Sequence, residues 1–116
     1  MLKITRKIAS LTTQAAGDIT FDASAYWIET REYMLFVNIT AITGSPTNVQ
    51  FSLKENVDGT FFMNGTSTLT ATGTGTTKNG QPVYSIGMDA KLNVAFGGGT
   101  NPTVTADVYL VCYSGS

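Results

Sequence analysis

The 116-residue sequence contains no histidine and only one cysteine, Cys112. The missing histidine removes the commonest general base and metal ligand, and with it the Ser-His-Asp and Cys-His catalytic arrangements. One cysteine cannot form an intrachain disulfide or supply the ligands of a structural zinc site. On the apolar side of the last predicted strand, Cys112 is expected to be a buried, unreactive thiol. We therefore expect no cofactor, no metal site and no enzymatic activity.

Charged residues are scarce, at 13% of the sequence against roughly 25% in an average soluble domain. The net charge of −1 gives no general affinity for nucleic acid. No apolar run approaches the ~20 residues of a membrane span. Residues 1–11 lack the apolar core of a signal peptide. These patterns predict a protein that is made in a cytoplasm and binds neither nucleic acid nor membrane.

What the sequence does contain is period-two alternation of apolar and polar residues, interrupted by Gly, Pro, Asn and Asp at turns. The last segment, 103–113, places Val104, Ala106, Val108, Leu110 and Cys112 on one face. Loops are expected over 73–80 and 97–102 because glycine clusters there. Further strands are expected within 18–22, 33–42, 49–54, 61–63, 66–71, 83–86 and 91–96. Roughly eight short strands and no helical period predict an all-β fold, an antiparallel two-sheet sandwich of Greek-key or jelly-roll type.

The first residues do not share this clear alternation, so the sequence predicts an N-terminal arm over 1–17 and a sandwich domain over 18–116. Three of the seven basic residues, Lys3, Arg6 and Lys7, lie in the arm. The arm is either solvated or docked on an acidic neighbour. In the docked case Leu2, Ile4 and Ile8 are the apolar anchors, and the arm joins a neighbouring sheet by strand addition. Removing residues 1–11 is then expected to weaken assembly and to leave the sandwich folded.

Some apolar residues fall on the face opposite the predicted core. Met34 and Phe36 alternate against the Leu35, Val37 and Ile39 stripe, and Phe61, Phe62 and Met63 are three apolar residues in a row. One interpretation is a central strand covered on both sides by its own chain. The other is a subunit interface, where methionine and aromatic residues are enriched. Tyr26 and Trp27 leave the same two interpretations open.

Two stretches of the sequence resemble small structural proteins of tailed-bacteriophage virions. They are Val37 to Thr60, with its Gly-Ser-Pro and Asp-Gly-Thr turns, and Lys91 to Val111, with its Gly-Gly-Gly-Thr-Asn-Pro turn. The resemblance implies a β-sandwich on the capsid surface, a decoration or cement protein. Its partners would be the major capsid protein or other virion proteins, and it would form a homo-oligomer, for which a trimer is one possibility.

Two other functions stay open at this point. A tail, connector or head-fibre component has the same sandwich in another place. A carbohydrate-binding module would use Tyr26, Trp27 or Tyr84 as stacking platforms for sugar rings.

Overall fold

The computed structural model describes residues 3–22, 30–78 and 89–114, which contain eight β-strands and no helix. The strands are β1 (Lys3–Gln14), β2 (Gly17–Asp22), β3 (Thr30–Thr43), β4 (Asn48–Val57), β5 (Thr60–Ala71), β6 (Gly75–Lys78), β7 (Asp89–Gly97) and β8 (Thr103–Ser114). The predicted strand over 83–86 lies outside the described residues. The all-β prediction is confirmed.

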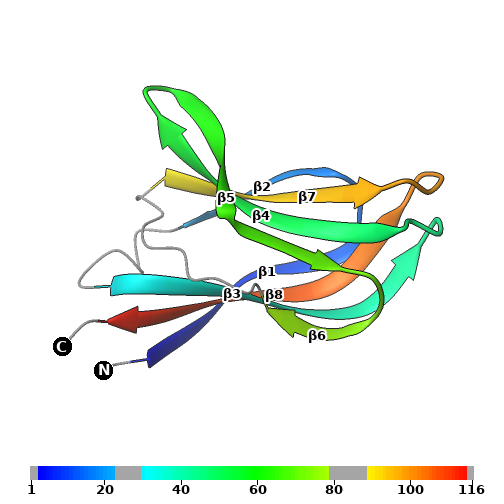
Figure 1. The fold of residues 1–116 in the computed structure, drawn as a ribbon, viewed down its shortest axis with the longest axis horizontal. Coiled ribbons are helices and arrows are strands. Elements are labelled where there is room, and N and C mark those ends of the chain that lie inside the picture. The colour runs from blue at the N-terminus through cyan, green and yellow to red at the C-terminus, as the bar shows by residue number, and fades with distance from the viewer. Residues whose placement is uncertain (1–2, 23–29, 79–88, 115–116) are drawn as a thin grey trace.

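The eight strands form two four-stranded antiparallel sheets that face each other (Figure 1). The first sheet has the order β1-β8-β3-β6 and the second the order β2-β7-β4-β5. The antiparallel pairs β1·β8, β2·β7, β3·β6 and β4·β5 are nested inside one another along the chain. A nested hairpin rolled into two sheets is the jelly-roll connectivity. The structure thus selects the jelly roll from the sandwich types that the sequence predicts.

The core lies between the sheets and is built from the inward residues of the alternating strands. Leu35, Phe51, Leu53, Leu92 and Leu110 are all fully buried. Because successive side chains of a strand point to opposite faces, one apolar stripe per strand is enough to fill this space. The predicted inward positions from Val104 to Leu110 are confirmed, whereas the side chain of Cys112 lies outside the described set.

The predicted N-terminal arm is not what the structure shows. Residues 3–14 form β1, which pairs along its length with β8 at the edge of the first sheet. Leu11 is buried in the core, and Ile8 packs against the core cluster. Two register shifts, between Lys7 and Ala9 and between Leu11 and Gln14, break the alternation of the segment. These bulges hid the strand from a period-two reading.

Two further details differ from the sequence prediction. The loop expected over 73–80 contains β6, a four-residue edge strand that pairs with β3. In β3, a register shift between Ile39 and Ala41 leaves Ala41 exposed and packs Ile42 against the core. Such a bulge moves every later side chain of the strand to the other face.

At one end of the sandwich, the β3–β4 and β7–β8 loops pack directly against each other. Thr100 donates its backbone N–H to the carbonyl of Gly44 at 2.9 Å. Gly44 has a φ of +83°, and a Cβ placed on it would lie 2.5 Å from the carbonyl oxygen of Thr100. Only glycine fits this conformation and this close approach. The two loops therefore brace each other.

Candidate functional site

The outer face of the first sheet brings together apolar residues of β3 and β8, with polar residues of β1 beside them. In the register, Tyr109 of β8 lies between Lys7 of β1 and Phe36 of β3. The next outward residue of β8, Val111, lies between Thr5 and Met34 in the same way. Cross-strand neighbours on one face of a sheet are in side-chain contact range. The strand pairing thus assembles one apolar patch out of residues far apart in the sequence.

This patch contains a shallow depression of about 310 Å³, which we call the outer groove. Val111 is only 4% exposed, although it is not part of the core cluster between the sheets. Met34, Phe36 and Tyr109 are half-buried. The second sheet packs on the inner face of the first sheet, on the side away from the outer groove (Figure 1). The residues that line the outer groove are Thr5, Phe36, Thr76, Tyr109 and Val111.

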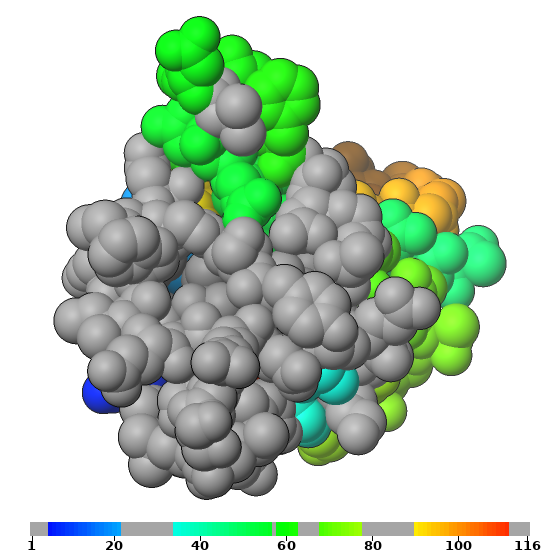
Figure 2. Space-filling model, turned by 60° about the vertical axis from the view of Figure 1, so that its left-hand side comes forward, coloured from blue at the N-terminus to red at the C-terminus, as the bar shows by residue number. Residues whose placement is uncertain are grey.

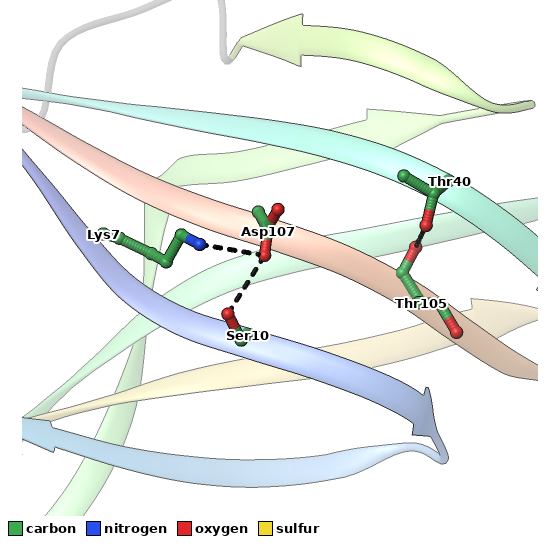
Figure 3. A network of polar contacts seen from close by, with 5 residues as sticks. All are labelled: Lys7, Ser10, Thr40, Thr105 and Asp107. Atoms are coloured by element: carbon green, nitrogen blue, oxygen red, sulfur yellow. Dashed lines mark hydrogen bonds and ion pairs between the residues drawn. The ribbon is translucent and has the colours of Figure 1, made fainter.

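A polar network borders the outer groove on the β1 side (Figure 3). The Lys7 ammonium lies 3.4 Å from Asp107 Oδ1, and Ser10 donates its hydroxyl to the same oxygen at 3.0 Å. Lys7 Nζ is also 5.9 Å from the ring centroid of Tyr109. The Lys7 side chain is 47% exposed, so it presents positive charge at the rim of the groove.

The network continues along β8, where Thr40 donates its hydroxyl to the backbone carbonyl of Thr105 at 3.2 Å (Figure 3). The Thr105 hydroxyl in turn accepts the backbone N–H of Thr13 at 3.0 Å. The outer face beside the groove thus carries neutral hydroxyls and one ion pair.

The second notable surface feature is the β4–β5 hairpin, which projects from the second sheet (Figures 1 and 2). Its turn is Asp58-Gly59, both at positive φ (+53° and +88°), the geometry of a tight hairpin turn. Asn56 Oδ1 accepts the backbone N–H of Gly59 at 2.9 Å and so ties the turn together. The sequence prediction of a turn at this point is confirmed.

Phe62 and Phe61 lie side by side on β5 but are in different surroundings. Phe62 is 56% exposed and pairs across the hairpin with Glu55. Burial raises the pKa of the Glu55 carboxyl. Phe61 points to the other face, where Lys91 Nζ lies 4.2 Å from its ring centroid, a favourable cation–π geometry. Phe61 therefore interacts within the chain, whereas Phe62 is exposed to solvent.

The outer face of the second sheet carries a different polar cluster. Asp18 on the edge strand β2 accepts a hydrogen bond from Asn93 at 2.8 Å and forms an ion pair with Lys54 at 3.0 Å. The hydrogen bond from Asn93 is the largest effect on this carboxyl, and together with Lys54 it lowers the pKa of Asp18 below its ordinary value. These contacts cross three adjacent strands and fasten the edge of the sheet.

The charged side chains that the structure describes differ between the two sheets. The first sheet carries Arg6 and Lys7 with Asp107, a net charge of +1. The second sheet and the β4–β5 turn carry Lys54 and Lys91 with Asp18, Glu55 and Asp58, a net charge of −1. Among these side chains, basic groups are in excess on the first sheet and acidic groups on the second.

The loop end of the sandwich holds two further hollows. One, of about 200 Å³, lies beside Ile42, Pro46 and Asn48, and the Oδ1 atom of Asn48 is buried without a partner. The other, of about 370 Å³, lies beside Phe96 and Pro102. The residues that line these two hollows carry no ionisable side chain.

Neither metal chemistry nor a membrane span is evident in the described part of the chain. Those residues hold no group of three or more His, Cys, Asp and Glu side chains that could bind a metal ion. They also include no helix long and apolar enough to cross a membrane.

The structure places the predicted interface residues in different surroundings. Met34 and Phe36 lie on the outer face of the first sheet, Phe62 is exposed on the hairpin, and Ile8 is taken up by the chain's own core. Tyr109 and Val111 were not predicted to be partners of Phe36. A signal was present, because Leu110 and Val111 are consecutive apolar residues that cannot both face the core. Outside the description lie Leu2, Tyr26, Trp27 and Tyr84 and the side chains of Ile4 and Met63.

The chain is thus a jelly-roll domain with an apolar groove on the outer face of its first sheet. No family model matches it, and the search of curated proteins finds no significant sequence match. The fold is similar to that of the phage-derived PBSX exported protein XepA, with a TM-score of 0.59 at 9% identity over 99% of this chain. The chain spans 38% of the length of XepA.

A second solved structure matches along the whole length of both chains. It is the CBM36-1 domain of a multidomain xylanase from the hindgut metagenome of Trinervitermes trinervoides. The TM-score is 0.52 at 10% identity, over 99% of this chain and 100% of that domain. The chain therefore shares its β-sandwich fold with a phage-derived protein and with a carbohydrate-binding domain. At these identities the likeness establishes the fold alone.

Proposed function

We propose that this chain is a non-enzymatic structural protein of a phage virion, a decoration protein that binds the outer face of the head and bridges capsid subunits. The observation that carries the proposal is the outer groove. It is an apolar depression with half-buried aromatic side chains beside the exposed ammonium of Lys7, and it suits contact with another protein rather than catalysis. The fold similarity to phage-derived XepA supports the proposal in a secondary way.

The proposed mechanism depends on the number of contacts rather than on the strength of each. Apolar burial contributes about 25 cal/mol per Å² before the cost of association is subtracted, so one small groove gives a weak contact. Many copies that engage a lattice at once gain stability from multivalency. The partners in this proposal are the major capsid protein and further copies of the chain, and the location is the capsid surface.

The test is the copy number of the chain in purified source particles, relative to the major capsid protein, measured by quantitative mass spectrometry. A ratio near one copy per capsid subunit, or a simple fraction of it, is the expected result. A ratio of a few copies per particle would move the chain to the tail, the connector or the head fibres. Its complete absence from the particles would overturn the virion proposal.

The second candidate function is carbohydrate binding, which the fold similarity to the CBM36-1 domain favours. Tyr109 and Phe36 are half-buried aromatic residues in a groove that also holds the hydroxyls of Thr5 and Thr76. Aromatic rings can stack against sugar rings, and neighbouring hydroxyls can form hydrogen bonds with the sugar. A pull-down on insoluble xylan and on bacterial cell wall, repeated with Tyr109→Ala, distinguishes this candidate. Binding that is lost in the variant would support it over the virion proposal.

A further inference from the structure

The described chain has one strongly exposed large apolar side chain and an apolar groove, and they lie on opposite sides of the molecule. Phe62 is 56% exposed on the hairpin that projects from the second sheet. The outer groove, about 310 Å³, is on the outer face of the first sheet. Phe62 therefore cannot fill the groove of its own chain. A second copy can supply the missing side chain.

The charges around the two features are opposite. Next to Phe62, the hairpin carries Glu55 as its cross-strand neighbour and Asp58 in the turn. At the groove, the half-exposed ammonium of Lys7 borders the ring of Tyr109. Complementary potentials of this kind select a partner and orient it.

We propose that the β4–β5 hairpin of one copy docks in the outer groove of the next, with Phe62 against Phe36, Tyr109 and Val111. An acidic surface of another protein could cover the groove and pair with Lys7, but it would leave Phe62 exposed. One contact between copies covers both apolar features and pairs both charges. This inference deepens the proposed structural function and rests on it for its biological meaning, but the contact itself needs no virion.

Because the hairpin and the groove lie on opposite sides of the chain, two copies cannot dock both pairs of surfaces at once, so the contact is heterologous. Each pair of copies still has one free hairpin and one free groove. Further copies add in the same orientation, so the assembly closes into a ring or continues as a row. A face-to-face dimer, in which the same patch meets itself, is not what this geometry produces.

The test is a mixing experiment with two complementary variants, followed by sedimentation velocity. Phe62→Ser removes the inserted side chain and keeps the groove. Thr5→Glu puts a bulky negative group into the groove, from an exposed position on β1, and keeps the hairpin. Thr60→Ser on the hairpin and Thr12→Glu on β1 are the matched controls, since both positions are exposed and outside the groove.

The wild-type chain and both controls are expected to form oligomers larger than a dimer. Each of the two test variants is expected to associate about thirtyfold more weakly or worse, as for a buried aromatic anchor. Their equal mixture is expected to form a 1:1 heterodimer. The intact hairpin of Thr5→Glu docks in the intact groove of Phe62→Ser. The heterodimer does not grow, because its other hairpin and its other groove are both altered. Thr76→Glu serves as a second groove variant if Thr5→Glu does not fold, as judged by thermal unfolding.

Three results would overturn the inference: a wild-type chain that is monomeric at all concentrations, a Phe62→Ser variant that associates like wild type, or a mixture that gives no heterodimer. All are measured on the purified chain without particles. Failure here is therefore distinct from failure of the virion proposal, which depends on the copy number in particles.

Discussion

At the scale of single residues, the two sheets use side chains differently on their outer faces. Ser10 and Lys7 converge on Asp107 beside the outer groove, and the interaction partners of that carboxylate come from an adjacent strand (Figure 3). Asp18 on the second sheet is held by Lys54 and Asn93, and these contacts span three strands. The Asp18 cluster is therefore a fastening of the sheet edge, whereas the Asp107 cluster shapes the rim of a candidate contact surface.

The Asp18 contacts make stability depend on pH in one direction. The pKa of Asp18 in the folded chain is lower than its ordinary value of 3.8. Its contribution is therefore complete above that value and is lost as the pH falls through the lower, folded-state pKa. Asp18→Asn is expected to reduce the free energy of unfolding by about 0.5–1 kcal/mol at pH 7, because the pair is partly exposed and screened.

Urea unfolding of wild type and Asp18→Asn, at pH 7 and well below the folded-state pKa, measures this effect. The difference between the two proteins is expected to shrink at the lower pH. Asp58→Asn, in the exposed turn of the hairpin, is the matched control. An equal difference at both pH values would contradict the assignment.

At the scale of elements, β1 is the strand whose role the structure changes most. It closes one edge of the first sheet by pairing with β8, and it contributes Leu11 to the core. A free arm is dispensable for folding, whereas a strand of this kind is not. Without β1, the apolar face of β8 and its unpaired backbone groups become a new sheet edge, which promotes aggregation.

We therefore expect the chain without residues 1–11 to lose cooperative unfolding and to aggregate, in contrast to the expectation from the sequence. Leu11→Ala is expected to lower the free energy of unfolding by about 2–4 kcal/mol, since Leu11 is 5% exposed in the core. Thr12→Ala, at the adjacent exposed position, is expected to stay within about 0.5 kcal/mol of wild type. Thermal and urea unfolding of these variants measure the effects. A truncated chain as stable as the full-length chain would support the prediction of a dispensable N-terminal arm.

At the scale of the whole molecule, the charges beside the hairpin and beside the groove are opposite. Glu55 and Asp58 lie near Phe62, and Lys7 lies at the rim of the outer groove. Between separate copies these charges act across solvent, where salt screens them. The screening length is about 10 Å at 0.1 M salt and about 3 Å at 1 M.

Self-association of the wild-type chain is accordingly expected to weaken about tenfold between 0.05 and 1 M sodium chloride. Sedimentation velocity across the salt series measures this change. Lys7→Ala removes one charge at the groove rim and is expected to reduce both the affinity and its salt dependence. Association that is independent of salt would assign the contact to apolar burial alone.

The sequence alone determined which way most side chains point. Alternation from Val104 to Leu110 and from Leu35 to Ile39 predicts the core stripes, and the structure confirms them. Asp58-Gly59 predicts a tight turn by itself, because Asp and Gly tolerate positive φ. These features are local: they depend on the pleat of one strand or the backbone freedom of two residues.

Only the tertiary structure decided which strands are neighbours. Alternation sets the face of a side chain but not the strand beside it, so the meeting of Phe36, Tyr109 and Val111 could not be predicted. The strands β1 and β6 were missed because bulges disturb the first and the second is short and glycine-led. The edge of the first sheet has the same origin, since β1 and β8 lie at opposite ends of the sequence and meet only in the folded chain.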